Sequence, residues 1–548
     1  MMPDIEHSTN DSFEISFSCI FSREFFELAA LVFVLSHAMG LFNKKKKDDD
    51  QNQSVTLKKE VSVLQGVSIV VGVIIGSGIF VSPVGVLTYT KSVGLSLILW
   101  SVTGLFSALG AIVYAELGVT IPRSGGEYIY ILQTFGPLPA FLAFWITFVV
   151  IGSASCAANG LIFADYILRP IYLNCATPTF VVRLVGVLGI LTLCFIHCFS
   201  VKWATKIAVV FTACKVAALL LIIGFGCYYL ALGNTESFKD SFEDSETSPG
   251  ALALAFYQGF WAFAGWNYLN FLTGEVKNPA RTLPIVIVLS LTTVTLIYIL
   301  TNVAYLAVLS PTEVLASGEG SAAIAVTFAT RCMGSFGLVM PALVGASVFG
   351  SINGEVFSIS RLAFTAGEEG HMPALLSMVN IERLTPIPSV LSVVILAIIF
   401  QMFDNIFYLI ELTGFAFAVI SAMAVGSLLH IRRTHPEMNT SGFRLPIWLP
   451  VLYLVVDIAI GILTVYQSPK TSAVSLGVMA LGIPVYLFGV SWKNKPKSMQ
   501  SLIYRVTVTL QKVLKVVEQE AASDTVKEND IHMKSAPSSP EISWGVTN

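Results

Sequence analysis

Residues 70–83 of this 548-residue chain read VVGVIIGSGIFVSP, an apolar run that Gly76, Ser77 and Gly78 interrupt. Glycines within a membrane helix often mark close packing between helices. The succession of glycine, serine and glycine also allows the helix to unwind, which frees backbone N–H groups that hydrocarbon cannot satisfy. An anionic ligand group would satisfy them, as in transporters whose broken helices hold a carboxylate near the bilayer midplane.

A second stretch repeats this pattern five predicted spans later. Residues 259–267 read GFWAFAGWN, in which Gly259 and Gly265 interrupt another apolar run. Two interrupted spans at corresponding positions indicate an inverted repeat that relates spans one to five to spans six to ten. We therefore expect a binding site near the midplane, between the first and the sixth span.

The composition is that of a membrane protein. Hydrophobic residues make up 55% of the chain and charged residues 12%, and the mean hydropathy is +0.75. Apolar runs recur that are long enough to cross a bilayer. We predict an all-α membrane protein with twelve transmembrane helices, arranged as a five-plus-five inverted repeat with broken helices 1 and 6. The predicted spans are 63–87, 93–117, 138–168, 180–199, 206–231, 250–272, 284–309, 322–360, 388–403, 405–430, 446–466 and 472–492.

The distribution of lysine and arginine over the loops fixes the orientation. These residues are concentrated in alternate segments, which predicts cytoplasmic N- and C-termini. We expect a cytoplasmic tail at 1–59, a transmembrane domain at 60–497 and a second cytoplasmic tail at 498–548. The Asn-x-Ser/Thr matches begin at Asn10, Asn52 and Asn439, all on the cytoplasmic side, so this chain should carry no N-glycan.

Lys215 is a charged residue within the fifth predicted span. At the centre of a membrane helix such a side chain costs about 2.5 to 3.5 kcal/mol or more. It either extends to a nearby end of the span or faces the bundle interior, where its ammonium would occupy the place of a coupling cation. Residues 123–127, RSGGE, we interpret as a solvated cytoplasmic turn, with a gate contact as the alternative.

Several classes of function find no support in the sequence. We see no setting for a nucleophile, no metal-ligand spacing among the cysteines and no loop that would cradle a nucleotide. We therefore expect neither an enzyme nor a cofactor or metal. The net charge of −3 gives no indication of a nucleic-acid partner.

Short motifs throughout the membrane domain match a known family. They include GVIIGSGIF at 72–80 with Pro83, GWNYLN at 265–270, and Asn278-Pro279. Further matches are YAELG at 114–118, SGG at 124–126, SVK at 200–202, GSING at 350–354, EGH at 369–371 and WKNKP at 492–496. From about residue 60 to 497 the chain resembles an L-type amino acid transporter light chain, from the heteromeric group of the amino acid/polyamine/organocation superfamily.

The resemblance implies a set of substrate-binding positions. The N–H groups of Ser77 and Gly78 would bind the substrate carboxylate, and the carbonyls of Ile74, Trp261 and Ala264 would bind its amino group. The Trp261 side chain would close over the substrate as an outer gate.

Three further roles follow from the same resemblance. Asn267 matches a polar position in the sixth span, and Lys215 matches the lysine that replaces a sodium ion, which implies sodium-independent exchange. Cys175, in the predicted outward loop between spans three and four, would form a disulfide with a single-pass glycoprotein heavy chain at the plasma membrane. A free thiol in this loop is the alternative. The expected partners are thus amino acid substrates, the heavy chain and membrane lipid.

Departures from the family pattern bear on the substrate. Ala264 replaces an acidic residue of the cystine and dibasic exchangers, Gly152-Ser153 replaces an Arg-Pro pair, and Gly274 replaces the first of two glutamates. Because these changes remove charged groups, we expect exchange of neutral L-amino acids. The alternatives are a cationic/neutral exchanger and an amino acid sensor that does not transport.

Overall fold

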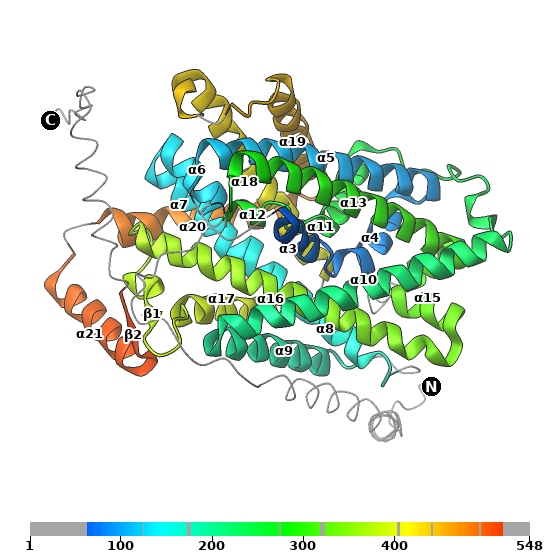
Figure 1. The fold of residues 1–548 in the computed structure, drawn as a ribbon, viewed down its shortest axis with the longest axis horizontal. Coiled ribbons are helices and arrows are strands. Elements are labelled where there is room, and N and C mark those ends of the chain that lie inside the picture. Colours follow the sequence, from blue (N-terminus) through cyan, green and yellow to red (C-terminus); the bar gives the residue numbers. More distant parts are fainter. Residues whose placement is uncertain are drawn as a thin grey trace, which may run out of the picture.

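Most of the chain folds into long helices that run side by side (Figure 1). The computed structural model describes residues 63–518 except 124, 173–176, 272, 274–275, 318–323, 403–405, 440–441 and 493–494. In this part of the chain nine helices are long and apolar enough to cross a membrane, and a bent pair adds a tenth. The all-α membrane fold is therefore confirmed. The other two predicted spans correspond to shorter helices, so the count of twelve stays a prediction.

The helices outside the two broken spans have the following bounds. The helices of the membrane bundle are α5 (Val93–Thr120), α7 (Pro137–Ile146) and α8 (Ser153–Leu168) with the π-helical segment Thr147–Gly152 between them, α9 (Thr179–Phe199), α10 (Val201–Ala231), α13 (Pro279–Val308), α16 (Val339–Glu368), α17 (Ile387–Phe400), α18 (Ile406–Thr434), α19 (Trp448–Gln467) and α20 (Pro469–Tyr486). The other helices are α6 (Gly126–Phe135), α14 (Pro311–Ala316), α15 (Ile324–Met333) and α21 (Lys497–Leu514).

The first span is broken where the sequence predicts it. Helix α3 (Val63–Ile74) ends before the glycines, a 3-10 turn covers Gly78–Phe80, and α4 (Ser82–Thr90) continues at an angle of 56°. A Cβ atom on Gly78 would lie 2.3 Å from the Cα atom of Ala262 in the sixth span. Only a residue without a side chain allows this approach.

The sixth span is broken as well. Helix α11 (Pro249–Ala262) and the short helix α12 (Tyr268–Phe271) are separated by turns, in which Gly265 has a φ of +100°. A Cβ atom on Gly265 would lie 2.5 Å from a methyl carbon of Val73 in α3. Each break thus packs its glycine against the other broken span, and the prediction of broken helices 1 and 6 is confirmed.

The predicted span 322–360 is wrong in its boundaries. The structure divides it into α15 and α16, which a 3-10 turn at Gly334–Leu338 separates. Gly334 has a φ of +52°, a conformation that side chains disfavour and that ends the α-helix. The membrane-crossing helix is α16, which continues to Glu368, eight residues beyond the predicted end.

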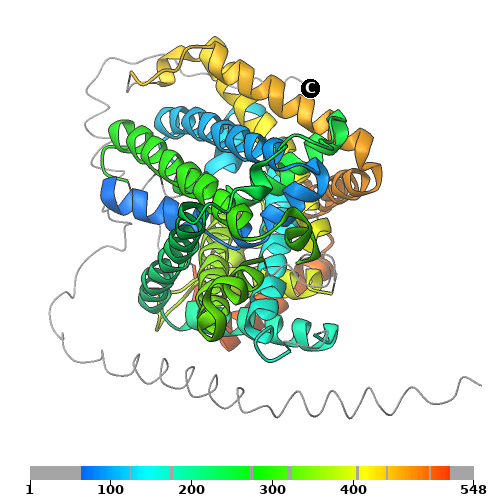
Figure 2. The same ribbon diagram turned by 90° about the vertical axis from the view of Figure 1, so that its right-hand side faces the viewer.

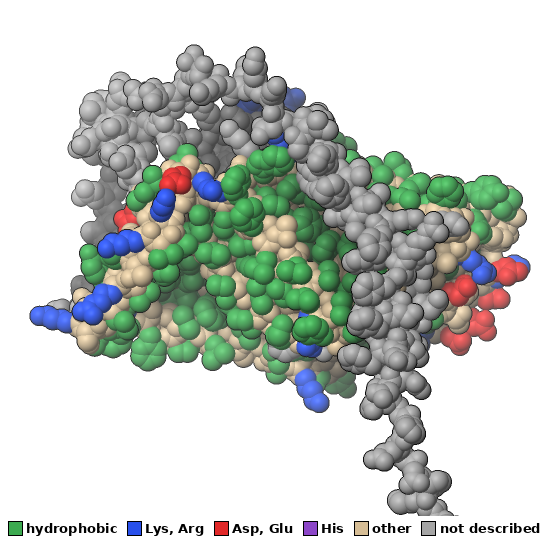
Figure 3. All heavy atoms as spheres, turned by 90° about the horizontal axis from the view of Figure 1, so that it is seen from below, with side chains coloured by type: hydrophobic (Ala, Val, Ile, Leu, Met, Phe, Trp, Pro, Cys, Tyr) green, Lys and Arg blue, Asp and Glu red, His purple; other side chains and the backbone are tan. Residues whose placement is uncertain are grey.

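The outer surface suits a lipid environment. Viewed along the bundle (Figure 2), the helices enclose one large apolar core, with α19 and α20, in gold and orange, at the edge. Of the apolar 18-residue stretch that would cross the membrane, only 22% is buried in α19 and 11% in α20. In Figure 3, hydrophobic side chains cover the middle of the visible face, whereas basic groups gather at one end and acidic groups at the other. This is the distribution expected of a protein that crosses a bilayer.

The C-terminal helix α21 packs at one end of the bundle. After it, β2 (Val516–Val517) pairs antiparallel with β1 (Val379–Asn380), in the register Val379 to Val517 and Asn380 to Val516. The Asn380 side chain also donates to the Leu514 carbonyl at 2.8 Å. These bonds attach the start of the predicted C-terminal tail to the segment that follows α16.

Candidate functional site

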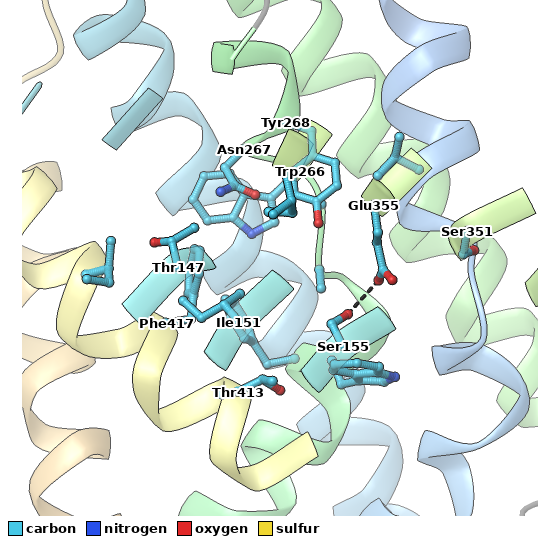
Figure 4. Close-up of a pocket in the computed structure, with 18 of the residues that line it drawn as sticks. Thr147, Ile151, Ser155, Trp266, Asn267, Tyr268, Ser351, Glu355, Thr413 and Phe417 are labelled. Atoms are coloured by element: carbon cyan, nitrogen blue, oxygen red, sulfur yellow. Dashed lines mark hydrogen bonds between the residues drawn. The ribbon is translucent and has the colours of Figure 1, made fainter. Parts of the chain in front are cut away.

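A cavity of about 880 Å³, counting the space open to solvent, adjoins the broken spans. Its lining comes from the sixth span around its break, from α6, the π-helical segment, α8, α16 and α18, and from Val73 of α3. Figure 4 shows Glu355 and Ser155 on one side of it and Thr147 and Phe417 on the other.

The first-span break leaves backbone donors without partners. The last backbone bond of α3 comes from the N–H of Ile75, and the next backbone donor along the chain is Phe80. Among the described residues, nothing accepts a hydrogen bond from the N–H groups of Gly76, Ser77 or Gly78. Because free N–H groups are costly in a membrane interior, this break is suited to bind an anion.

Ser77 and Gly78 lie beside the cavity and do not line it. The Ser77 hydroxyl is buried and donates to the side-chain oxygen of Asn159 in α8. A Cβ atom on the neighbouring Gly76 would lie 2.8 Å from the hydroxyl oxygen of Ser351, which does line the cavity. The first-span break at Gly76 therefore lies next to a residue of the cavity lining.

Two of the predicted carbonyl positions already accept hydrogen bonds. The hydroxyl of Tyr298 in α13 lies 3.0 Å from the Ile74 carbonyl oxygen and 2.9 Å from that of Ala262, so it bridges the two breaks. The Trp261 carbonyl accepts from the N–H of Ala264 at 3.1 Å. Trp261 and Ala264 line the cavity, whereas Ile74 does not.

The Trp261 side chain, predicted to be an outer gate, is partly buried. It packs against a small apolar cluster of α8 and α18 that contains Ala154, Leu161 and Leu409. The neighbouring Trp266 is held differently, because its ring meets Phe417 edge to face at 5.8 Å between centroids. Trp266 thus forms a packed wall of the cavity, and Trp261 is the less constrained of the two.

Lys215 points into the bundle and not toward an end of its span. Its side chain is 1% exposed, and its Nζ atom donates to the Gly72 carbonyl at 2.7 Å and to the Ser351 hydroxyl at 3.3 Å. The ammonium therefore joins α10, the first broken span and α16. A carbonyl freed at a helix break is the kind of ligand that a coupling cation uses in broken-helix transporters.

Asn267 lines the cavity and has a partner that sequence reasoning missed. Its Nδ2 atom donates to Oε1 of Glu127 at 2.6 Å. Glu127 is 3% exposed and lies in the first turn of α6, so the interpretation of 123–127 as a solvated turn is wrong for this residue. Burial raises the pKa of Glu127 to about 7, and the hydrogen bond from Asn267 opposes the shift.

Glu355 is the second missed residue. It belongs to α16, lines the cavity and is 9% exposed. Its Oε1 atom accepts from the Ser155 hydroxyl at 2.5 Å and from Nδ2 of Asn159 at 2.7 Å. The available signal was a lone acidic residue within an apolar span, the same signal that identified Lys215.

Comparison with known proteins gives the family. The amino acid permease family model matches residues 61–504. The chain belongs to the amino acid permease family. Its relatives include the cystine/glutamate transporter of Homo sapiens, 40% identical over 474 residues that cover 86% of this chain and 94% of the relative.

Two further relatives cover similar lengths of this permease. The large neutral amino acids transporter small subunit 2 of Rattus norvegicus is 40% identical over 477 residues, covering 86% of this chain and 88% of the relative. The b(0,+)-type amino acid transporter 1 of Mus musculus is 37% identical over 484 residues, covering 87% and 98%. The resemblance found in the sequence is confirmed, and the permease is a multi-span amino acid transporter.

Polar contacts connect the helices of the permease on either side of the cavity. On the side predicted to face outward, the Tyr89 hydroxyl of α4 donates to Oε1 of Glu411 in α18 at 2.6 Å. On the predicted cytoplasmic side, Arg432 of α18 donates from Nε to Oε1 of Glu116 in α5 at 2.8 Å. These contacts tie α18 to α4 and to α5, so movement of α18 requires that they break.

Several predictions from the sequence fall outside the described residues: the N-terminal tail 1–59 with Asn10 and Asn52, and two positions within the membrane domain of the permease. Cys175, the predicted partner of the heavy chain, is within 173–176, and Gly274 is within 274–275. The loop disulfide and the effect of Gly274 on the substrate therefore stay predictions.

Proposed function

We propose that this permease exchanges neutral L-amino acids across the plasma membrane by alternating access, without sodium. The observation that carries the proposal is that the N–H groups of Gly76, Ser77 and Gly78, beside the cavity, have no acceptor among the residues that the structure describes. They would bind the substrate carboxylate, while carbonyls at the sixth-span break, such as that of Ala264, bind its amino group.

Sodium independence rests on Lys215. Its ammonium donates to the Gly72 carbonyl, where a coupling cation would otherwise bind, and it is a fixed part of the chain. Because the protein already supplies this charge, no ion has to enter with the substrate. Opening on the outer side would require the Tyr89 hydroxyl to separate from Glu411, and Trp261 would then close over the bound amino acid.

Counterflow in proteoliposomes tests this function. We expect labelled leucine to accumulate in sodium-free buffer only when the vesicles contain unlabelled amino acid. Equal uptake into loaded and empty vesicles would rule out obligatory exchange. A requirement for external sodium would rule out the role of Lys215. Saturable binding of leucine without any flux would instead identify a sensor.

The partner proposal concerns Cys175. We infer that the permease is the light subunit of a heterodimer in which Cys175 forms a disulfide with a single-pass glycoprotein heavy chain. The name of one relative, which contains the words small subunit, supports this proposal. The expected orientation has both termini in the cytoplasm.

Replacing Cys175 with serine should remove a reducible high-mass band from a non-reducing gel of membranes that contain both chains. Uptake per molecule at the surface should change by less than about threefold, since the outward loop is remote from the predicted midplane site. Persistence of the band in the Cys175→Ser variant would exclude this disulfide. The matched control is Cys227→Ser, which replaces an exposed cysteine of α10 and should keep the band.

A second candidate function is exchange of cationic as well as neutral amino acids. The carboxyl group of Glu355 at the cavity favours it, because it is an acidic group that could bind a cationic substrate side chain.

A further inference from the structure

The cavity has an acidic lining that binding of the amino acid head group does not use. Two carboxylic acid side chains line it, those of Glu127 and Glu355. No lysine, arginine or histidine is present among the described residues of the lining. The ionisable acids of the lining disfavour an acidic substrate side chain and favour a cationic one.

The two carboxyl groups are held in different ways. Glu127 lies in α6 and its Oε1 atom is bound by Asn267. Glu355 lies in α16, where Ser155 and Asn159, one turn apart on α8, both donate to Oε1. The other oxygen, Oε2, is buried and accepts no hydrogen bond from any described residue. The two donors thus fix the carboxyl group at Oε1, and within the described part of the chain Oε2 has no hydrogen-bond partner; Figure 4 shows the bond from Ser155.

The nearby cation does not occupy that oxygen. Lys215 directs its ammonium to the Gly72 carbonyl and to Ser351, one turn before Glu355 on α16. Within the described part of the chain, Glu355 forms no salt bridge with Lys215 or with any other basic residue. A buried carboxylate oxygen without a partner is costly, so a cationic donor from the substrate would bind there with little competition from the protein.

We propose that Glu355 is the specificity-determining residue for the substrate side chain, and that its Oε2 atom binds the ammonium or guanidinium group of a dibasic amino acid. The proposal rests on the function proposed above and extends it from neutral to dibasic substrates. The remaining lining supports both classes. Val73, Ile151 and Ile359 offer apolar surface to a neutral side chain or to the methylene groups of lysine and arginine.

The Glu355→Gln variant tests the proposal, because glutamine keeps the shape of the side chain and removes its charge. In counterflow assays of the complete chain, we expect kcat/KM for arginine to fall about tenfold or more, as for loss of a charged hydrogen bond in a desolvated site. For leucine we expect a change below about threefold. Glu355→Asp keeps the charge and should retain more arginine exchange than Glu355→Gln.

The matched control is Glu127→Gln, which alters the other carboxyl group of the cavity. Because Glu127 positions Asn267, this variant should lower arginine and leucine exchange to a similar extent. If a variant fails to reach the membrane, thermal shifts of the purified chain with arginine and with leucine give the same comparison. Only the arginine shift should disappear in Glu355→Gln.

Two results would overturn the assignment. Equal losses for arginine and leucine in Glu355→Gln would place the α-ammonium of every substrate at this carboxylate. Leucine exchange by the unmodified chain without any exchange of arginine would also refute it, while the proposed neutral exchange would stand. If the unmodified chain exchanges no amino acid at all, the proposed function fails and this inference falls with it.

Discussion

Replacement of Lys215 by alanine is expected to lower amino acid exchange by about tenfold or more. The change removes the donor to the Gly72 carbonyl and to the Ser351 hydroxyl, both of which lie where the first broken span meets α16. A buried polar group that loses its partner costs about 1–3 kcal/mol, which corresponds to roughly 5- to 150-fold in an equilibrium constant. Exchange should fall although Lys215 does not line the cavity, because the charge holds the break in shape.

The control for this prediction is Lys206→Ala on the same helix. Lys206 is exposed, and its Nζ atom lies 5.3 Å from the centre of the Trp203 ring on the same helix. Surface abundance of both variants is measured by biotinylation, and leucine counterflow is divided by it. Wild-type exchange by Lys215→Ala in sodium-free buffer would exclude the role of Lys215 as a substitute for a cation.

The Gly78→Ala variant is expected to lower exchange by a similar factor, for a steric reason. Its Cβ atom would lie 2.3 Å from the Cα atom of Ala262, and backbone on both sides leaves no flexible side chain to move. Overpacking of this kind costs about 1–3 kcal/mol, and here it would also push the two breaks apart.

Gly224→Ala is the matched control for Gly78→Ala. Gly224 lies on α10, is exposed, and has no heavy atom within 4 Å of the position of an added Cβ atom. Its variant should exchange leucine at the wild-type rate, and both should be compared in thermal stability as purified protein. Full activity and stability of Gly78→Ala would contradict the close contact between the broken spans.

The breaks could be predicted from the sequence because their cause is local. Gly76 and Gly78 lie two positions apart, and glycine destabilises an α-helix. Gly265 adopts a positive φ that other residues disfavour. The same reasoning should have divided the eighth predicted span at Gly334. It did not, because the apolar run continues through this glycine and hydrophobicity alone cannot distinguish one long helix from two.

The acidic side of the cavity could not be predicted from local patterns. Glu127 follows two glycines in a segment that resembles a surface turn, and its burial depends on the packing of α6 against the sixth span. Glu355 is bound by residues that precede it by about 200 positions in the chain. A lone carboxylate in an apolar span was visible, but its partners and its free oxygen depend on the tertiary fold.

The position of a bound amino acid tests the central claim most directly. A cryo-EM structure with leucine should place its carboxylate oxygens about 2.7–3.2 Å from the N–H nitrogens of Ser77 and Gly78, with its amino group at the sixth-span break. Leucine bound elsewhere, with those N–H groups still unpaired, would contradict the account. So would a first span that is continuously helical through residues 76–78.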